Sequence, residues 1–276
     1  MPKKKLLITV GAGASIDFGL PSVKDVDQLL DDLAGTIWPL EDDPTSNLYC
    51  YCRNAIDSYY NSSPKPELRN YVNFEEVLYQ LNLLIPYLAD QSRLHGSNAL
   101  LAAKPLPAVR EFGRMPKPVD DQVVRNLRNL LIDGLVDHFI DECATASTAK
   151  AAEIVELTNF LTALLDEFEI GIITLNYDNL FTQALPQLYT GFDGAGTFVA
   201  MDVLTRAEWN FVYHLHGSVH FAMTGHPHEL HGITWTATPS KNPSVHTSVR
   251  SAPDSLERRS YPSSPFVAGY GKTQQI

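Results

Sequence analysis

Three short polar segments hold the residue types that chemistry would need. The first is GAGAS at residues 11–15, in which two glycines stand one residue apart and a serine follows. Glycines in such a turn let the backbone approach a pyrophosphate, and the free N–H groups of a following helix favour an anion. The usual dinucleotide pattern has a third glycine three residues on, whereas the next glycine here is Gly19. The segment indicates a nucleotide-binding turn, with a plain change of chain direction as the alternative.

The second segment is TLNYDNL at residues 174–180, where Asn176 and Asp178 lie two residues apart after an apolar run. Open α/β sheets place their ligands beyond the carboxyl ends of the strands, where these side chains would lie. Asn and Asp also favour turns and helix N-caps, and that preference alone explains one of them. The pair therefore indicates a ligand site when a second motif follows a strand in the same way.

That second motif is HLHGS at residues 214–218. His214 and His216 have the spacing of a strand, so we expect both to face one side of the sheet and Leu215 the other. A histidine followed by Gly-Ser at a strand end suits a general base or a hydrogen-bond partner of a sugar hydroxyl. More histidines follow and leave a metal hydrolase open as an alternative, although one carboxylate accompanies them: His220, His226, His228, Glu229 and His231.

The elements that would position these segments are strands and helices of contrasting periodicity. Apolar runs at residues 5–10 and 170–174 predict buried strands, and a β-rich run leads into HLHGS. Helical periodicity separates them in four segments: 22–33 with Ser22 as N-cap, 73–88 with Asn73 and Glu76 as a capping box, 121–140 and 150–168.

This order predicts an α/β fold, a Rossmann-like doubly wound parallel sheet with a helical insertion subdomain. We expect residues 1–30 and 166–276 to form the Rossmann-like domain and residues 31–165 the insertion. The Ser-, Pro- and Thr-rich stretch 236–265 predicts a long loop. Because the chain stops just after a further apolar step at residues 263–272, we expect a natural chain that continues past residue 276.

Composition narrows the classes of function. Of the 276 residues 44% are apolar and 19% charged, and the net charge of −11 with no basic block beyond residues 3–5 disfavours direct nucleic-acid binding. No apolar run approaches the roughly 18 residues of a membrane span, and the run at residues 6–10 is too short for a signal peptide, so we expect a cytoplasmic protein without a membrane partner. Three cysteines, Cys50, Cys52 and Cys143, predict small buried thiols.

Taken together, the three segments resemble the sirtuin family. GAGAS and the GLP that ends at Pro21 resemble the family's Gly-Ala-Gly-x-Ser…Gly-x-Pro cofactor loop, TLNYD resembles its Thr-x-Asn-x-Asp segment, and LHGS its histidine-glycine motif. FVAGYGK at residues 266–272 is a weaker match to the glycine turn near the adenosine. The resemblance covers the first 25 residues or so and those from 170 onward.

The resemblance implies NAD as the substrate and a role for each matching residue. Asn176 would orient a ribose hydroxyl or a water, His216 would contact the ribose hydroxyls and act as general base, and Asp178 would support the nicotinamide pocket. The other residues implied to bind NAD lie in the glycine loop and around the histidine: Gly11, Ala12, Gly13, Ser15, Pro21, Gly217 and Ser218.

Two departures from the family pattern narrow the expected activity. The Asp-Phe-Arg of the protein deacylases is replaced by SVK at residues 22–24, and two C-x-x-C pairs for a zinc ion are missing. The chain then resembles the zinc-less, NAD-degrading branch found in bacterial anti-phage defence effectors. That branch implies an NAD+ glycohydrolase without zinc, acting in abortive infection, which releases nicotinamide and ADP-ribose or a cyclised product.

The same resemblance implies a homo-oligomer that is restrained by a regulatory partner, such as an ATPase or a nucleic-acid-sensing protein. Two other functions remain open. One is a non-catalytic module that senses NAD or ADP-ribose and gates a partner ATPase or nuclease. The other is a residual protein deacylase or ADP-ribosyltransferase. The sequence leaves open the trigger and the choice between NAD and NADP.

Overall fold

The computed structural model describes residues 3–62, 72–89, 106–110, 114–223, 233–239 and 241. These residues divide into two compact units, one built from residues 3–22 and 136–241 and the other from residues 23–135. The predicted domain limits at residues 30 and 166 remain a prediction. Within the described ranges, no helix has both the length and the apolar character that crossing a membrane requires.

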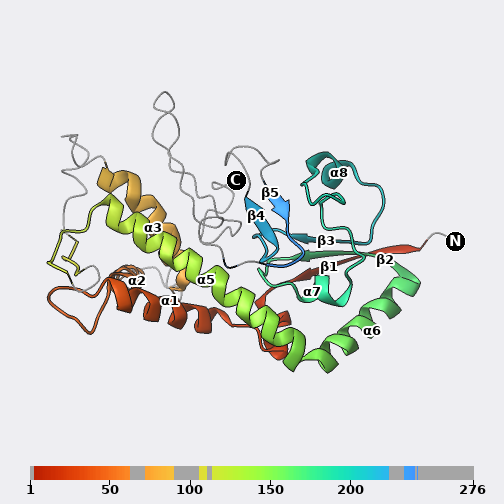
Figure 1. Ribbon diagram of the computed structural model, residues 1–276, viewed down its shortest axis with the longest axis horizontal. Coiled ribbons are helices and arrows are strands. Elements are labelled where there is room, and N and C mark those ends of the chain that lie inside the picture. Colours follow the sequence, from red (N-terminus) through yellow and green to blue (C-terminus); the bar gives the residue numbers. More distant parts are fainter. Residues whose placement is uncertain are drawn as a thin grey trace. The chain divides into compact units, whose positions relative to one another are not determined.

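A parallel sheet forms the centre of the first unit (Figure 1). Its strands are β1 (Lys4–Val10), β2 (Phe168–Thr174) and β3 (Phe211–His214), in the order β1-β2-β3. The register pairs Val10 with Thr174 and Thr174 with His214, so all three strands end at the same level. The predicted α/β, Rossmann-like class is confirmed.

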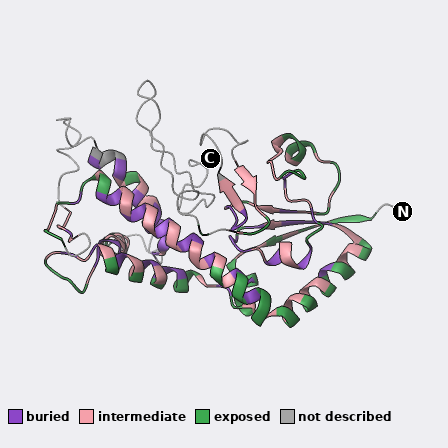
Figure 2. Cartoon of the chain, in the orientation of Figure 1, coloured by how far each residue is buried: buried purple, intermediate pink, exposed green. Residues whose placement is uncertain are grey.

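One face of this sheet carries buried β-branched side chains. Ile170, Ile172 and Val212 are fully buried, and α6 (Ala151–Glu167) leads into β2 and packs against it and against α7 (Leu180–Ala184) (Figure 2). On the other face the Phe211 ring lies over Gly171, where a Cβ would come within 2.5 Å of the ring. Because successive side chains along a strand point to opposite faces, Ile170 and Ile172 of β2 lie on one face and Gly171 on the other.

Short elements complete the described part of this unit. Two 3-10 turns follow β1, namely η1 (Ala12–Ala14) and η2 (Ile16–Phe18). Helix α8 (Ala200–Thr205) precedes β3, and the antiparallel strands β4 (Phe221–Met223) and β5 (Ile233–Trp235) follow it. The predicted step at residues 263–272 and most of the predicted loop 236–265 lie outside the described residues.

The second unit is helical. It contains α1 (Val23–Ile37), α2 (Leu48–Asn61), α3 (Phe74–Ala89) and residues 121–135 of α5 (Asp121–Ala149). The predicted helices are confirmed, and Asn73 caps α3 by accepting the Glu76 N–H at 3.2 Å. Helix α2 was not predicted, because its cysteines, tyrosines and polar residues give no clear apolar period.

All three cysteines are free thiols in this fold. Cys143 on α5 is buried as predicted, whereas Cys50 and Cys52 on α2 are half-buried. Burial raises the pKa of the Cys143 and Cys52 thiols to about 12, so both stay protonated and pack as small apolar groups.

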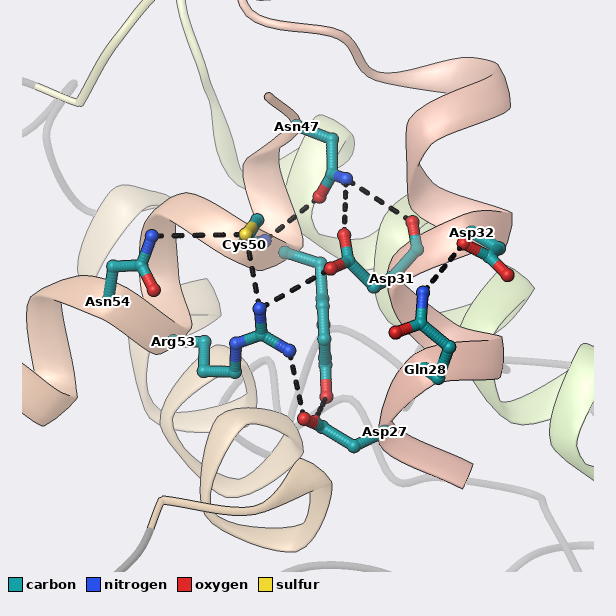
Figure 3. A network of polar contacts seen from close by, with 9 residues as sticks. Asp27, Gln28, Asp31, Asp32, Asn47, Cys50, Arg53 and Asn54 are labelled. Carbon is teal, nitrogen blue, oxygen red and sulfur yellow. Dashed lines mark hydrogen bonds and ion pairs between the residues drawn. The ribbon is translucent and has the colours of Figure 1, made fainter. Parts of the chain in front are cut away.

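A polar network joins α1 to α2 (Figure 3). The buried carboxylate of Asp27 accepts hydrogen bonds from the Tyr49 hydroxyl and, at 2.8 Å, from Arg53. Arg53 also reaches Asp31 at 3.3 Å, and Asn47 donates to Asp31 at 2.7 Å. Because a buried carboxylate is tolerated only when it is paired, Arg53 is the cation on which this contact depends.

We predict that Arg53→Met lowers the free energy of unfolding by about 2–4 kcal/mol, since it leaves Asp27 buried without its cation. Urea unfolding of the purified protein measures this loss. Arg110→Met is the matched control, because Arg110 pairs with Glu41 at 3.8 Å on the surface and should cost less than about 1 kcal/mol. Equal losses in both variants would contradict the prediction.

Candidate functional site

The three polar segments begin where the three strands end. The backbone ladder continues one residue further, since Leu175 N–H donates to the Val10 carbonyl and Leu215 N–H to the Thr174 carbonyl, both at 3.0 Å. Segments far apart in the sequence are therefore brought side by side at the carboxyl edge of the sheet. This is the edge at which α/β sheets bind ligands.

The glycine loop between β1 and α1 folds into the two 3-10 turns. Gly19 ends the second turn with φ of 81°, a left-handed conformation that favours glycine. Gly11 and Gly13 do not have a positive φ, and a Cβ built on either would meet no atom of the described residues within 4 Å. The fold itself thus does not require glycine at 11 or 13, and the space over their backbone is open. Pro21 is half-buried in the stretch before α1.

Asn176 is held to this loop by its side chain. Its Nδ2 donates to the Gly11 carbonyl at 3.0 Å and to Ser15 Oγ at 2.9 Å, and its backbone N–H donates to Thr174 Oγ1 at 3.0 Å. Because a carbonyl oxygen can only accept, the contact with Gly11 fixes which end of the amide is nitrogen. Asn176 Oδ1 therefore points away from these partners as the remaining acceptor.

Ser15 and Asp178 complete the same arrangement. The Ser15 hydroxyl donates to Asp178 Oδ2 at 2.7 Å, and Asp178 Oδ1 accepts the Leu180 N–H at 3.0 Å. Both side chains are buried, and burial raises the pKa of Asp178 while these hydrogen bonds oppose the rise. The Ser15 hydroxyl thus bridges Asn176 and Asp178 rather than facing open space.

The histidine segment differs from its prediction. Strand β3 ends at His214 and His216 lies in a turn, so the expectation that both histidines lie in one strand is wrong. The physical reason is that β2 ends at Thr174, whose carbonyl accepts the last ladder hydrogen bond from Leu215, and that Gly217 turns the chain with φ of 95°. His216 is half-buried in this turn.

Two further hydrogen bonds fix the histidine turn. The Val219 N–H donates to the Tyr177 carbonyl at 2.9 Å, which ties this turn to the TLNYD segment. Ser218 is fully buried, and its Oγ accepts the His220 N–H at 3.3 Å. Gly217 and Ser218 thus shape the turn that carries His216.

His214 and His220 lie in an aromatic cluster next to the turn. His214 Nδ1 is 3.3 Å from the Asn176 carbonyl oxygen, and its ring is 6.1 Å from Phe221 and 6.3 Å from Trp235. His220 stacks on Trp235 at 4.5 Å, with Nδ1 at 2.8 Å from the Thr236 carbonyl. Burial lowers the pKa of His214 to about 4 and also lowers the pKa of His220.

The metal alternative receives no support within the described ranges. There, no group of three or more His, Cys, Asp or Glu side chains has a geometry that could hold a metal ion. The other residues on which that alternative depends lie outside the described residues: His226, His228, Glu229 and His231.

Three residues around the site were not identified from the sequence. Thr174 holds the Asn176 backbone, Phe139 packs edge-on against Tyr177 at 5.6 Å, and the Cys143 sulfur accepts a hydrogen bond from the Asn179 backbone. The helical period at residues 121–140 indicates that Phe139 faces inward, but it does not reveal which loop that face meets.

Part of the chain is similar to a known protein family. A family model described as a SIR2-like domain matches residues 170–238. The matched range includes the TLNYD and LHGS segments, while the glycine loop lies before it. No curated protein matches the chain.

We predict that the buried, neutral His214 causes the free energy of unfolding to fall as the pH is lowered. Its pKa is about 4 in the folded protein against about 6.5 in an unfolded chain, so protons bind the unfolded state first and stability is lost below pH 6.5. Between pH 7.5 and 5.0 this amounts to about 2 kcal/mol, which urea unfolding of wild type and His214→Phe should reveal as a difference in pH dependence.

The raised pKa of Asp178 acts in the opposite direction, so the difference between variant and wild type is the quantity to compare. His138→Phe serves as the control, because His138 is a half-exposed residue on α5. If His214→Phe kept the pH dependence of the wild type, His214 would not be buried in neutral form.

Proposed function

Because the chain carries a sirtuin-like domain over residues 170–238, we propose that it is an NAD+ glycohydrolase. SIR2-like domains are NAD-dependent enzymes, and NAD is the substrate they use. The observation that carries the proposal is the contact of Asn176 with Gly11 and Ser15, which joins the family's catalytic asparagine segment to the glycine loop.

The proposed reaction breaks the bond between the nicotinamide nitrogen and C1′ of the ribose. The bonding electron pair leaves with nicotinamide and neutralises the pyridinium charge, so the leaving group needs no proton. Water adds its oxygen to C1′ and gives up one proton. The products are nicotinamide, ADP-ribose and a proton, through a transition state with oxocarbenium character.

Asn176 supports this reaction as a fixed hydrogen-bond acceptor. With Nδ2 occupied by Gly11 and Ser15, its Oδ1 is available to orient a ribose hydroxyl or the attacking water. An acceptor that is already held in place needs no reorganisation during the reaction, which is the usual source of such catalysis.

His216 is the proposed general base. It lies in the turn after β3, which the Val219–Tyr177 hydrogen bond fixes beside the Asn176 segment. A neutral imidazole there can accept the proton of the water or of a ribose hydroxyl. Asp178 contributes by orienting the Ser15 hydroxyl, which in turn accepts from Asn176.

The glycine loop would hold the pyrophosphate. The open space over Gly11 and Gly13 is where a phosphate could approach the backbone, and Ala12 and Gly13 open a 3-10 turn whose first N–H groups have no partner within the turn. The remaining features of the proposal rest on the resemblance: no zinc, a homo-oligomer, a regulatory partner and a role in anti-phage defence.

We predict that the purified wild type releases nicotinamide from NAD, and that Asn176→Ala and His216→Ala each lower kcat by about 10²–10³-fold. Chromatography of the products separates ADP-ribose from a cyclised nucleotide. Asn54→Ala and His138→Ala are the controls, because Asn54 bonds to Cys50 and His138 pairs with Glu142, each within its own helix, α2 or α5. NAD binding without turnover in the wild type would favour the sensing function instead.

We also predict that Gly13 serves NAD binding, whereas Gly19 serves the stability of the fold. Gly13→Ala should change the free energy of unfolding by less than about 0.5 kcal/mol but raise KM for NAD by at least about tenfold, since its Cβ would occupy the phosphate position. Gly19→Ala should instead cost about 1 kcal/mol of stability because of its φ of 81°. An unchanged KM in Gly13→Ala would contradict the phosphate role.

A further inference from the structure

Asn176 is held by all three strand ends, and His214 supplies the third contact. The side-chain amide of Asn176 bonds to the loop after β1, and its backbone N–H bonds to Thr174 at the end of β2. Its backbone carbonyl lies 3.3 Å from His214 Nδ1 at the end of β3. The two backbone contacts fix the peptide groups on both sides of the Asn176 side chain.

The geometry also decides the tautomer of His214. The Asn176 carbonyl oxygen can only accept, so Nδ1 carries the proton and the lone pair lies on Nε2. Nε2 is sealed from solvent and takes no hydrogen bond from the described residues. A buried acceptor without a partner destabilises the fold, and an apolar ring of similar shape would not carry this cost.

The surroundings of His214 would accept such an apolar ring. Phe221 and Trp235 flank it, and Phe192 packs against both of them at 5.2 and 5.5 Å. Packing alone would therefore be served at least as well by phenylalanine. A polar residue that breaks the packing rule at the edge of a site indicates a functional constraint.

We propose that His214 is a positioning residue of the candidate site, whose Nδ1–H holds the Asn176 carbonyl and thereby fixes the direction of the Asn176 amide. This role is distinct from that of His216, and for catalysis it rests on the proposed NAD cleavage. The hydrogen bond of His214 is to the backbone of Asn176 and not to the glycine loop. It acts through Asn176.

Two substitutions distinguish the effect of the His214 Nδ1–H hydrogen bond from the effect of its aromatic ring. His214→Phe keeps the ring and loses the donor, while His214→Asn loses the ring and places an amide N–H where Nδ1 stood. His220→Phe is the matched control, because His220 lies in the same aromatic cluster and also bonds a backbone carbonyl, that of Thr236, without contacting Asn176.

With NAD as substrate, His214→Phe should lower kcat by about 10–100-fold with KM within about threefold, because a small displacement of a catalytic group costs rate rather than binding. His214→Asn should recover most of kcat, and His220→Phe should retain it. Equal rates in His214→Phe and wild type, or an equal loss in His220→Phe, would overturn the proposal.

A second readout does not depend on activity. In amide NMR spectra the Nδ2 signals of Asn176 should shift in His214→Phe, return towards wild type in His214→Asn and stay in place in His220→Phe. If the wild type failed to cleave NAD, the proposed reaction would be wrong. The NMR signals would still show whether His214 positions Asn176. Unmoved signals in His214→Phe would overturn it whatever the activity.

Discussion

The ladder that pairs Val10 with Thr174 and Thr174 with His214 determines where the candidate site forms. Parallel pairing stops at one level, so the three loops that follow leave the same edge of the sheet. The next hydrogen bonds, from Leu175 and Leu215, carry the register into the loops themselves. The backbone pairing alone therefore brings together residues about 160 positions apart in the sequence, such as Gly11 and Asn176.

Side-chain hydrogen bonds then hold the loops in a fixed arrangement. Ser15 donates to Asp178 and accepts from Asn176, so one hydroxyl joins the first loop to the second. Burial disfavours the charged forms of both Asp178 and His214, as the directions of their pKa shifts indicate. Such costs persist where the surrounding fold holds the groups in place, and they concentrate at functional sites.

The sequence predicted the three strands of the parallel sheet, four of the longer helices and the three segments, because apolar period and glycine, asparagine and histidine placement are local signals. It did not predict the end of β3 at His214, since that depends on where its neighbour β2 stops. It also missed the contacts of Thr174, Phe139 and Cys143 with the site, which only tertiary packing creates. For Ser15, the motif predicted a place in the loop but not its hydrogen-bond partners.

We propose that the three strand-end loops form one site for NAD. A crystal structure of the Asn176→Ala variant with NAD tests it most directly. We expect the pyrophosphate over Gly11 and Gly13, with the nicotinamide-bearing ribose between residue 176 and His216. NAD bound away from this edge, or with its pyrophosphate remote from the glycine loop, would show that the three loops do not form one NAD site.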